Sequence, residues 1–213
     1  MMKHSKGILV VVSGFAGAGK GTIMRQLLEN YDNYALSVSM TTRQPRQGER
    51  DGVEYFFSSR EDFEKKIAED GLIEYAEYCG NYYGTPRHYV EQQLLSGRDV
   101  ILEIEIQGAF QVKKKFPEAI LVFVTPPGAA ELKRRLVGRG TETIEVIDRR
   151  MRRAAEEAEH MGDYDYLVVN DDFRTCAEEI HRIIQASRRK PGCNEEFIEE
   201  IKAELKALSK GDN

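Results

Sequence analysis

The feature that most constrains this chain is a glycine-rich turn, Gly14-Phe-Ala-Gly-Ala-Gly19-Lys20, which fits the pattern G-x-x-x-x-G-K. It follows an apolar, β-branched run at 8–12 that predicts a buried parallel strand, and it precedes helical spacing at 22–30. Glycines suit such a turn because backbone N–H groups must point inward around phosphates, in conformations that side chains disfavour. Strand, turn and helix together predict a phosphate-binding loop, and a glycine-rich turn with a chance lysine is the alternative.

The residues of this loop have distinct expected roles. Lys20 supplies a mobile positive charge for the outer phosphates, and the hydroxyl of Thr22 is a candidate group for Mg²⁺. Gly21 has no side chain to bind a metal, so we expect the ion to be held mostly through phosphates and water. The expected nucleotide-binding residues here are Gly14, Phe15, Ala16, Gly17, Ala18, Gly19, Lys20, Gly21 and Thr22. The loop alone does not name a reaction, because GTPases, ATPases and kinases all use one.

Other apolar runs extend the strand–helix alternation along the chain. Three more strands are predicted at 100–106, 120–124 and 166–169. Helices are predicted at 129–138, 144–159 and 175–187. Strands that alternate with helices imply a parallel sheet covered on both faces. The expected fold class is therefore α/β, with a parallel sheet of the phosphate-loop NTPase type flanked by helices.

The segment 37–99 interrupts this alternation. Short, aromatic-rich strands surround an expected helix at 60–69, and we interpret the segment as an inserted α+β lobe. Near the C-terminus, 195–208 has the spacing of an amphipathic helix. The expected division is a core at 1–36 and 100–188, the lobe at 37–99 and a helical tail at 189–213.

Composition excludes several other classes of protein. The 213 residues carry a net charge of −5, which gives no general attraction for nucleic acid. No apolar run approaches the roughly 20 residues of a membrane helix. The three cysteines, Cys79, Cys176 and Cys193, are far apart and form no C-x-x-C motif for zinc or redox chemistry. We expect a cytoplasmic protein that binds anions through a local group of positive charges, with neither nucleic acid nor a membrane as partner.

The segment from Ser39 to Phe57 gathers groups that suit a phosphate ligand. Arg43 and Arg46 lie three residues apart, and a guanidinium can bind two phosphate oxygens at once. Tyr55 adds a rigid hydroxyl. This set favours the phosphate of a mononucleotide, and a solvated basic turn is the alternative.

A carboxylate at Glu74 extends this hypothesis to the base. A fixed carboxylate accepts hydrogen bonds from N1–H and the exocyclic amine of guanine, whereas adenine offers no such pair of donors. If left unpaired, a buried Glu would discriminate by about several hundredfold or more. Tyr82 and Tyr83 follow in the string G-N-Y-Y-G-T, where they are either packing aromatics or, for Tyr83, a contact to phosphate.

With these residues, the chain resembles the guanylate kinase family. The matching strings are the phosphate loop, S-x-T-T-R-x-P-R-x-G-E, G-N-Y-Y-G-T, L-E-I-E-I-Q-G, G-R-G-T-E-T and V-N-D-D, in this order between residues 7 and about 188. The resemblance implies direct, in-line transfer of the terminal phosphoryl group from MgATP to GMP without a phosphoenzyme. The lobe at 37–99 would then bind GMP.

The resemblance also implies roles for single residues. The phosphate of GMP would be bound by Ser39, Arg43, Arg46, Tyr55 and Tyr83, with Gly84 beside them. Glu49 would fix this cluster or contact the sugar. Guanine would be recognised by Glu74, Thr85 and Glu105, and Glu103 would organise Mg²⁺ through water.

Two departures from the family pattern affect these roles. The family often has Asp at the positions of Glu103 and Glu105, so the carboxylates here lie one methylene further out. Phe15 and Ala16 stand where a Pro-Ser pair is common, which removes one hydroxyl contact from the loop but leaves its backbone groups.

Arginines after residue 133 are predicted to form a lid at about 138–160. Gly138 and Gly140 offer a hinge, and mobile arginines would neutralise the migrating phosphoryl group and exclude water. By resemblance, the catalytic residues are Lys20, Arg135, Arg139 and Arg150. The arginines expected on a solvated face with glutamate partners are Arg134, Arg149, Arg152 and Arg153. Asn170 would border adenine, or would only end a strand.

Three other functions compete with this interpretation. A non-catalytic binding module of the same fold tends to lack the loop lysine and lid arginines, which are present here. A kinase for another phosphorylated acceptor should lack Glu74 and Thr85. A GTPase should carry an N-K-x-D motif, which does not occur. The sequence leaves open whether dGMP is used and whether the protein is a monomer or a homodimer.

Overall fold

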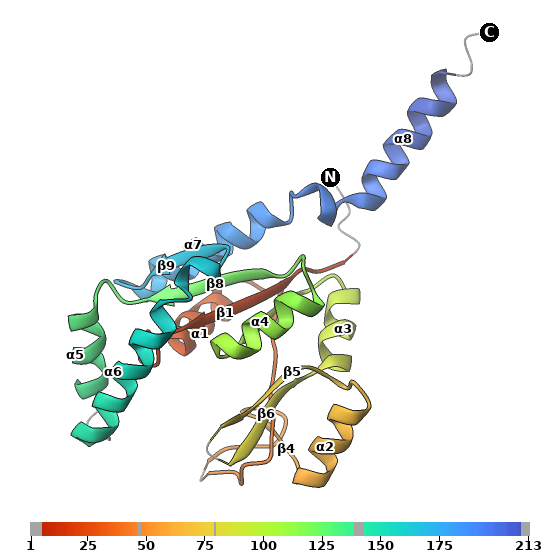
Figure 1. The fold of residues 1–213 in the computed structure, drawn as a ribbon. Coiled ribbons are helices and arrows are strands. Elements are labelled where there is room, and N and C mark those ends of the chain that lie inside the picture. The colour runs from red at the N-terminus through yellow and green to blue at the C-terminus, as the bar shows by residue number, and fades with distance from the viewer. Residues whose placement is uncertain (1–5, 47, 79, 139–142, 210–213) are drawn as a thin grey trace.

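A computed structural model describes residues 6–46, 48–78, 80–138 and 143–209 (Figure 1). Its centre is a five-stranded sheet in the order β2-β7-β1-β8-β9, in which every neighbouring pair of strands is parallel. These strands are β1 (Leu9–Gly14), β2 (Tyr34–Leu36), β7 (Asp99–Glu103), β8 (Ile120–Thr125) and β9 (Tyr166–Val169). The predicted α/β class with a helix-flanked parallel sheet is confirmed.

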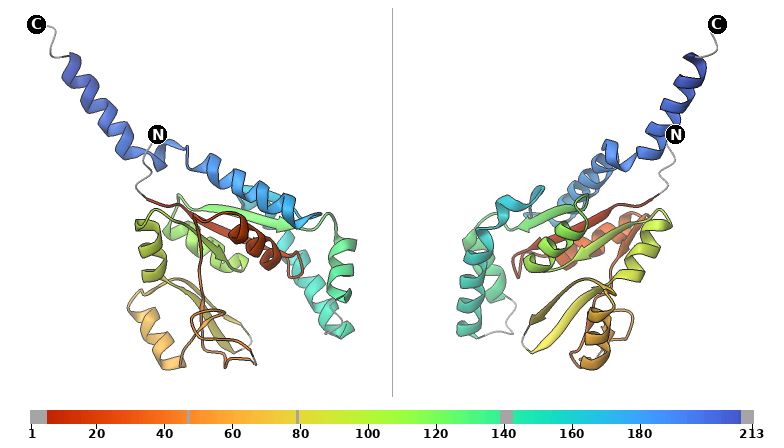
Figure 2. Two further views of the ribbon diagram at one scale, coloured as in Figure 1. Left: turned by 180° about the vertical axis from the view of Figure 1, so that it is seen from behind. Right: turned by 45° about the vertical axis from the view of Figure 1, so that its right-hand side comes forward.

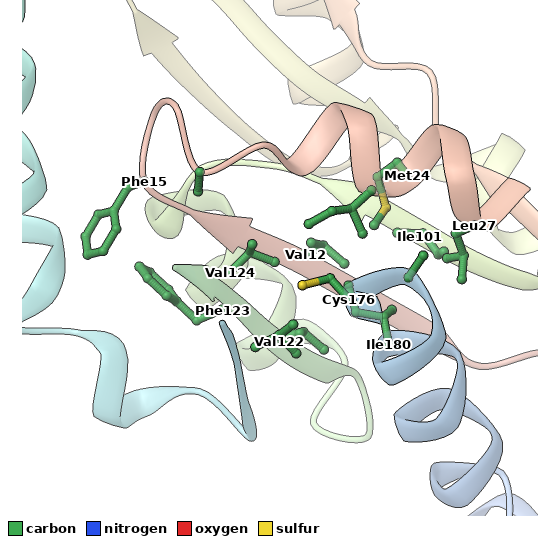
Figure 3. Close-up of a cluster of buried hydrophobic side chains, with 14 of the residues drawn as sticks. Val12, Phe15, Met24, Leu27, Ile101, Val122, Phe123, Val124, Cys176 and Ile180 are labelled. Carbon is green, nitrogen blue, oxygen red and sulfur yellow. The ribbon is translucent and has the colours of Figure 1, made fainter. Parts of the chain in front are cut away.

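Helices cover both faces of this sheet. Alternate residues of each strand are therefore buried on opposite faces. Val10 and Val12 of β1 join one hydrophobic cluster, while Leu9 and Val11 join a second on the opposite face. Side chains of α1 and α7 meet over the first face (Figure 3). The covering helices are α1 (Lys20–Asn30) and α7 (Phe173–Ser187) on that face, and α3 (Arg87–Leu95) and α4 (Ile106–Lys115) on the other.

The region after β7 differs from the prediction. A strand was expected to run to Ile106, but β7 ends at Glu103 and α4 begins at Ile106. Glu105, with extended backbone angles, precedes the first turn of α4. Ile106 is buried in the core as a residue of the helix and not of the strand. The apolar run therefore continues from the strand into the helix, and its end does not mark the end of the strand. The sequence analysis also missed α3 and β2.

A second, four-stranded sheet lies beside α4, at the bottom of Figure 1, in the order β4-β3-β6-β5. Ile73 at its base joins the core cluster under the large sheet, and Gln111 of α4 bonds the main chain of Tyr75. Its elements are β3 (Met40–Thr41), β4 (Phe56–Phe57), α2 (Arg60–Ala68), β5 (Leu72–Tyr78) and β6 (Asn81–Pro86). This is the region interpreted as an inserted lobe, although Val90 and Leu94 of α3 pack against the large sheet. The exact domain limits stay a prediction.

The remaining helices lie at two opposite ends of the molecule. α5 (Ala129–Gly138) and α6 (Ile144–Ala158) pack near the phosphate loop, and the single turn η1 (Met161–Asp163) leads to β9. After η2 (Pro191–Cys193), α8 (Glu195–Ser209) extends away from the body with no buried residue (Figure 2). Among the described residues, no helix combines the length and the apolar character that crossing a membrane requires.

Candidate active site

The phosphate loop leaves the C-terminal end of β1 and enters α1 directly. Gly19 precedes the helix with a left-handed φ of 92°, which favours glycine. A Cβ atom placed on Gly19 would lie 2.5 Å from Nδ2 of Asn170, so glycine is also needed for space. The side chain of Phe15 is buried and packs edge-on against Phe123, with ring centroids 5.0 Å apart. Only the main chain of Phe15 is therefore available to a ligand of the loop.

Lys20 lines a pocket of about 290 Å³. Its Nζ donates hydrogen bonds to the carbonyl oxygens of Gly14, at 2.6 Å, and Phe15, at 3.3 Å. Burial raises the pKa of Glu103 in the same pocket, and the charge of Lys20 opposes that shift. The pocket is lined by Gly17, Gly19, Lys20, Gly21, Thr22, Arg25 and Glu103.

The opposite side of the loop is held by Asn170 and Arg135. Asn170 Nδ2 donates to the carbonyl oxygen of Ala18 at 2.7 Å, and the Asn170 side chain is buried. Arg135 donates from Nη2 to the Asn170 carbonyl at 2.8 Å and from Nη1 to the Ala18 carbonyl at 3.4 Å. Glu131 fixes Arg135 through its Nε at 2.7 Å. The end of β9 and helix α5 are thus joined to the loop.

In the second sheet, Arg43 and Glu49 form the centre of a polar cluster. Arg43 Nη2 donates to both carboxylate oxygens of Glu49, at 2.9 and 3.0 Å, and the backbone N–H of Arg46 donates to the same carboxylate at 2.7 Å. The hydrogen bond from Arg43 is the main cause of the lowered pKa of Glu49. The Arg43 guanidinium also lies 5.3 Å from the ring centre of Tyr55, which in turn packs against Tyr83.

Glu74 and Thr85 form a buried pair on neighbouring strands β5 and β6. Thr85 Oγ1 donates to Glu74 Oε1 at 2.7 Å, and both residues are buried. Burial raises the pKa of Glu74, and the bond from Thr85 opposes this. A Cβ atom on Gly108 of α4 would lie 2.7 Å from Glu74 Oε2, and one on Gly84 would lie 2.8 Å from the Glu74 carbonyl oxygen. Both glycines allow the close packing that fixes this carboxylate.

A hydrogen bond joins Glu105, in front of α4, to the helix α6. The Glu105 side chain is exposed and accepts a hydrogen bond from Arg153 Nη2 at 3.1 Å. Arg150, predicted to be catalytic, is partly buried on the same helix as Arg153. The predicted catalytic residue Arg139 lies outside the described residues.

Comparison with known proteins gives a consistent result. The family model described as guanylate kinase matches residues 6–187. The guanylate kinase of Desulfitobacterium hafniense is 50% identical over 194 residues, which cover 89% of this chain and 97% of that protein. The guanylate kinase of Halalkalibacterium halodurans is 53% identical over 189 residues, covering 89% of this chain and 93% of that protein.

A solved structure agrees with these relatives. The crystal structure of guanylate kinase from Anaplasma phagocytophilum has a TM-score of 0.72 and 36% identity, and the match covers 89% of this chain and 90% of that chain. The chain belongs to the guanylate kinase family. The resemblance drawn from the six sequence strings is confirmed.

In this member of the family, the predicted residues fall into two groups. The loop residues, Arg135 and Asn170 lie together at the ends of β1 and β9, and Glu103 lies across the pocket from them. The second group lies on or beside the second sheet and contains Ser39, Arg43, Arg46, Glu49, Tyr55, Glu74, Tyr83, Gly84 and Thr85. Ser39 contacts this sheet through its carbonyl oxygen, which accepts from the Phe56 N–H at 2.9 Å.

The sequence analysis missed two residues, Arg25 and Gly108, and one contact of Arg153. Arg25 of α1 lines the loop pocket, and no local motif marks it. Gly108 packs on the carboxylate of Glu74, and a glycine within an apolar run was an available signal of such close approach. Arg153 was expected on a solvated face with glutamate partners, and its side chain is 42% exposed and bonds Glu157 on the same helix; its bond to Glu105 was not expected.

Proposed function

We propose that this chain transfers the terminal phosphoryl group of ATP to GMP, giving ADP and GDP. The observation that carries the proposal is the buried Glu74–Thr85 pair, because a fixed and desolvated carboxylate is the acceptor that guanine requires. It lies on the second sheet, whereas the phosphate loop with Lys20 lies at the end of the first. The two sheets therefore supply one site for each nucleotide.

On the acceptor side, we assign the guanine N1–H and exocyclic amine to Glu74, with Thr85 holding its Oε1 in place. The phosphate of GMP would be bound by Ser39, Arg43, Arg46, Tyr55 and Tyr83. Glu49 orients Arg43 through two hydrogen bonds, which supports the role of Arg43 as a pre-organised phosphate ligand. These contacts address base and phosphate, so we propose that dGMP is accepted as well.

On the donor side, the loop N–H groups and Lys20 would surround the phosphates of ATP. In this structure Lys20 bonds carbonyls of its own loop and would turn to the phosphates when they bind. Arg135, Arg139 and Arg150 would neutralise charge on the group in transfer. An oxygen of the GMP phosphate is already anionic and attacks directly, so no side-chain base is required.

The residues at the loop fit Mg²⁺ that is bound chiefly to phosphate and water. A Cβ atom on Gly21 would lie 4.0 Å from Glu103 Oε2, so this carboxylate faces the loop. No group of three or more acidic, His or Cys side chains suited to a metal occurs in the described part of the chain, and Mg²⁺ with nucleotide needs only one or two carboxylates. Thr22 and Glu103 would hold it, with Glu103 acting through water. When bound, the ion would neutralise charge on the ATP phosphates.

The test is a coupled assay for ADP with MgATP and GMP, dGMP, AMP, UMP or CMP in parallel, with Lys20→Ala as the control. We expect turnover with the guanine nucleotides only, and a loss of about 10²–10³-fold in kcat for the variant. Absence of turnover with every nucleotide, in protein shown to be folded, would favour a non-catalytic binding module instead.

A further inference from the structure

Arg153 of α6 lies between two carboxylates from different parts of the fold. Its Nε donates to Glu157 Oε1 at 2.8 Å, one helical turn further along α6. Its Nη2 donates to Glu105 Oε2 at 3.1 Å, at the junction of β7 and α4. Because a guanidinium is planar and rigid, fixing one edge of it also fixes the direction of the other.

The two carboxylates differ in exposure. The Glu157 side chain is only 12% exposed, whereas that of Glu105 is 65% exposed. Burial raises the pKa of Glu157, and the hydrogen bond from Arg153 opposes this rise. The charge of Glu105 further raises the pKa of Glu157, and the charge of Lys20 lowers it. Of the two carboxylates bound to Arg153, the buried Glu157 is therefore the one held in place.

Glu105 needs such a support to act on a ligand. Its backbone is fixed in front of α4, but three side-chain torsions separate the backbone from the carboxylate, one more than in Asp. An exposed side chain of this length samples several rotamers unless a partner selects one. Arg153 occupies Oε2, and the second oxygen, Oε1, can accept from a donor on the guanine.

We propose that Arg153 is a positioning residue for guanine recognition: held by Glu157, it orients Glu105 so that Oε1 accepts from the exocyclic amine of GMP. The inference rests on the proposed function and deepens it. It adds a role to the expected solvated face with glutamate partners, because one of those partners is Glu105. Arg153 should therefore affect the binding affinity of a nucleotide whose base carries the exocyclic amine, and not that of a nucleotide whose base lacks it.

IMP provides the comparison, because hypoxanthine has the N1–H of guanine but no exocyclic amine. Calorimetric titration of the protein and its variants with GMP and with IMP separates a contact to the exocyclic amine from contacts to the rest of the base. We expect Arg153→Met to weaken GMP binding by about 10-fold, the lower end of the effect of losing one hydrogen bond to a charged group. Binding of IMP and the KM for ATP should change by less than about twofold, which is smaller than the effect of losing one such hydrogen bond. Arg152→Met, at an exposed neighbour on α6, is the matched control and should change neither.

A double-mutant cycle with Glu105→Gln identifies the route of the effect. If Arg153 acts through Glu105, the double variant binds GMP no more weakly than Glu105→Gln alone. Additive losses, or equal losses for GMP and IMP, would overturn the inference. If Arg153→Met does not fold because Glu157 is left unpaired, Arg153→Met combined with Glu157→Gln removes the buried charge and carries the same expectation. Failure of the proposed function is distinguishable, because the unmodified protein would then neither phosphorylate nor bind GMP.

Discussion

The two proposed nucleotide sites of this molecule are built by different means. At the phosphate loop, main-chain groups form much of the site, and neighbouring side chains such as Asn170 and Arg135 bond the carbonyls of the loop. On the second sheet, side chains hold side chains, as Glu49 does for Arg43 and Thr85 does for Glu74. The first site is encoded in a contiguous stretch, whereas the second depends on residues that only the folded sheet brings together.

This difference predicts how each site should fail. A backbone site should be damaged by changes that alter main-chain geometry and should tolerate side-chain changes that preserve it. A side-chain site should respond to single atoms, because one altered oxygen or nitrogen removes a partner from a buried or oriented group. Substitutions in the two sites therefore test whether one depends on backbone geometry and the other on single side-chain atoms.

The largest effect is expected for Glu74→Gln, which changes one carboxylate oxygen to an amide nitrogen at nearly constant volume. The new NH₂ group would face the donors of guanine, so kcat/KM for GMP should fall by about 10²–10³-fold. The KM for ATP should stay within about twofold, because no bond to the phosphate loop is lost. Steady-state kinetics with each substrate varied in turn measures both. A similar loss for both substrates would contradict separate sites.

Gly19→Ala should break the donor site through its backbone. The added Cβ would lie 2.5 Å from Asn170 Nδ2, at a residue with φ of 92°. Displacement of the loop by about 1 Å should lower kcat/KM for ATP by about 10²-fold. Gly97→Ala is the matched control, because Gly97 also has a positive φ, 85°, but a Cβ there meets nothing within 4 Å. It should lower the melting temperature and leave the kinetics intact; equal kinetic losses would refute the steric argument.

Arg43→Lys should produce a smaller loss on the acceptor side. Lysine keeps the charge but cannot bond Glu49 and a phosphate with one planar fork. The KM for GMP should rise by about 10-fold, and kcat should change less. Lys65→Arg on α2 is a control for exchange of the two cations in the same sheet region. An unchanged KM for GMP would mean that Arg43 serves only to hold the 39–57 segment together.

The buried carboxylate of Glu74 should also affect stability in a pH-dependent way. Its pKa is raised in the folded state, so the folded protein binds the proton more tightly than the unfolded chain. The stabilisation is present below the unfolded pKa of about 4.3 and is lost as the pH rises through the folded value. Glu74→Gln cannot ionise, so its melting temperature relative to the unmodified protein should increase from about pH 4 to about pH 8. Thermal unfolding at both pH values tests this, and a constant difference would show that Glu74 is not desolvated.

The smallest effect is expected for deletion of residues 195–213. No residue of α8 is buried, so the deletion removes little from the packed core. The melting temperature should shift by less than about 2 °C, which corresponds to less than roughly 1 kcal/mol for a domain of this size. Kinetic constants for both substrates should be unchanged. A large drop in either quantity would show that the tail supports one of the two sites.

The sequence predicted the phosphate loop more accurately than the contacts made between distant parts of the chain. The strand, loop and helix around Lys20 were predicted within about two residues, because their signal is local. The β7–α4 junction was not, because Ile104 and Ile106 continue the apolar pattern of the strand past its true end at Glu103. The contact of Gly108 with Glu74 joins residues far apart in the chain, and no periodicity reports it. Arg153 resembled its solvated neighbours until the fold placed Glu105 beside it.

The exposed tail helix has a consequence for how this protein can vary among related organisms. Phe197, Ile201, Leu205 and Leu208 are large apolar residues on α8 that remain exposed. Since none of them is buried, replacing them with polar residues should not be opposed by selection for a stable fold. If descendants of this chain nevertheless retain the apolar stripe, the constraint must come from something outside the folded monomer. The variation tolerated at these four positions would therefore measure the importance of an external contact, because selection for a stable fold does not act on them.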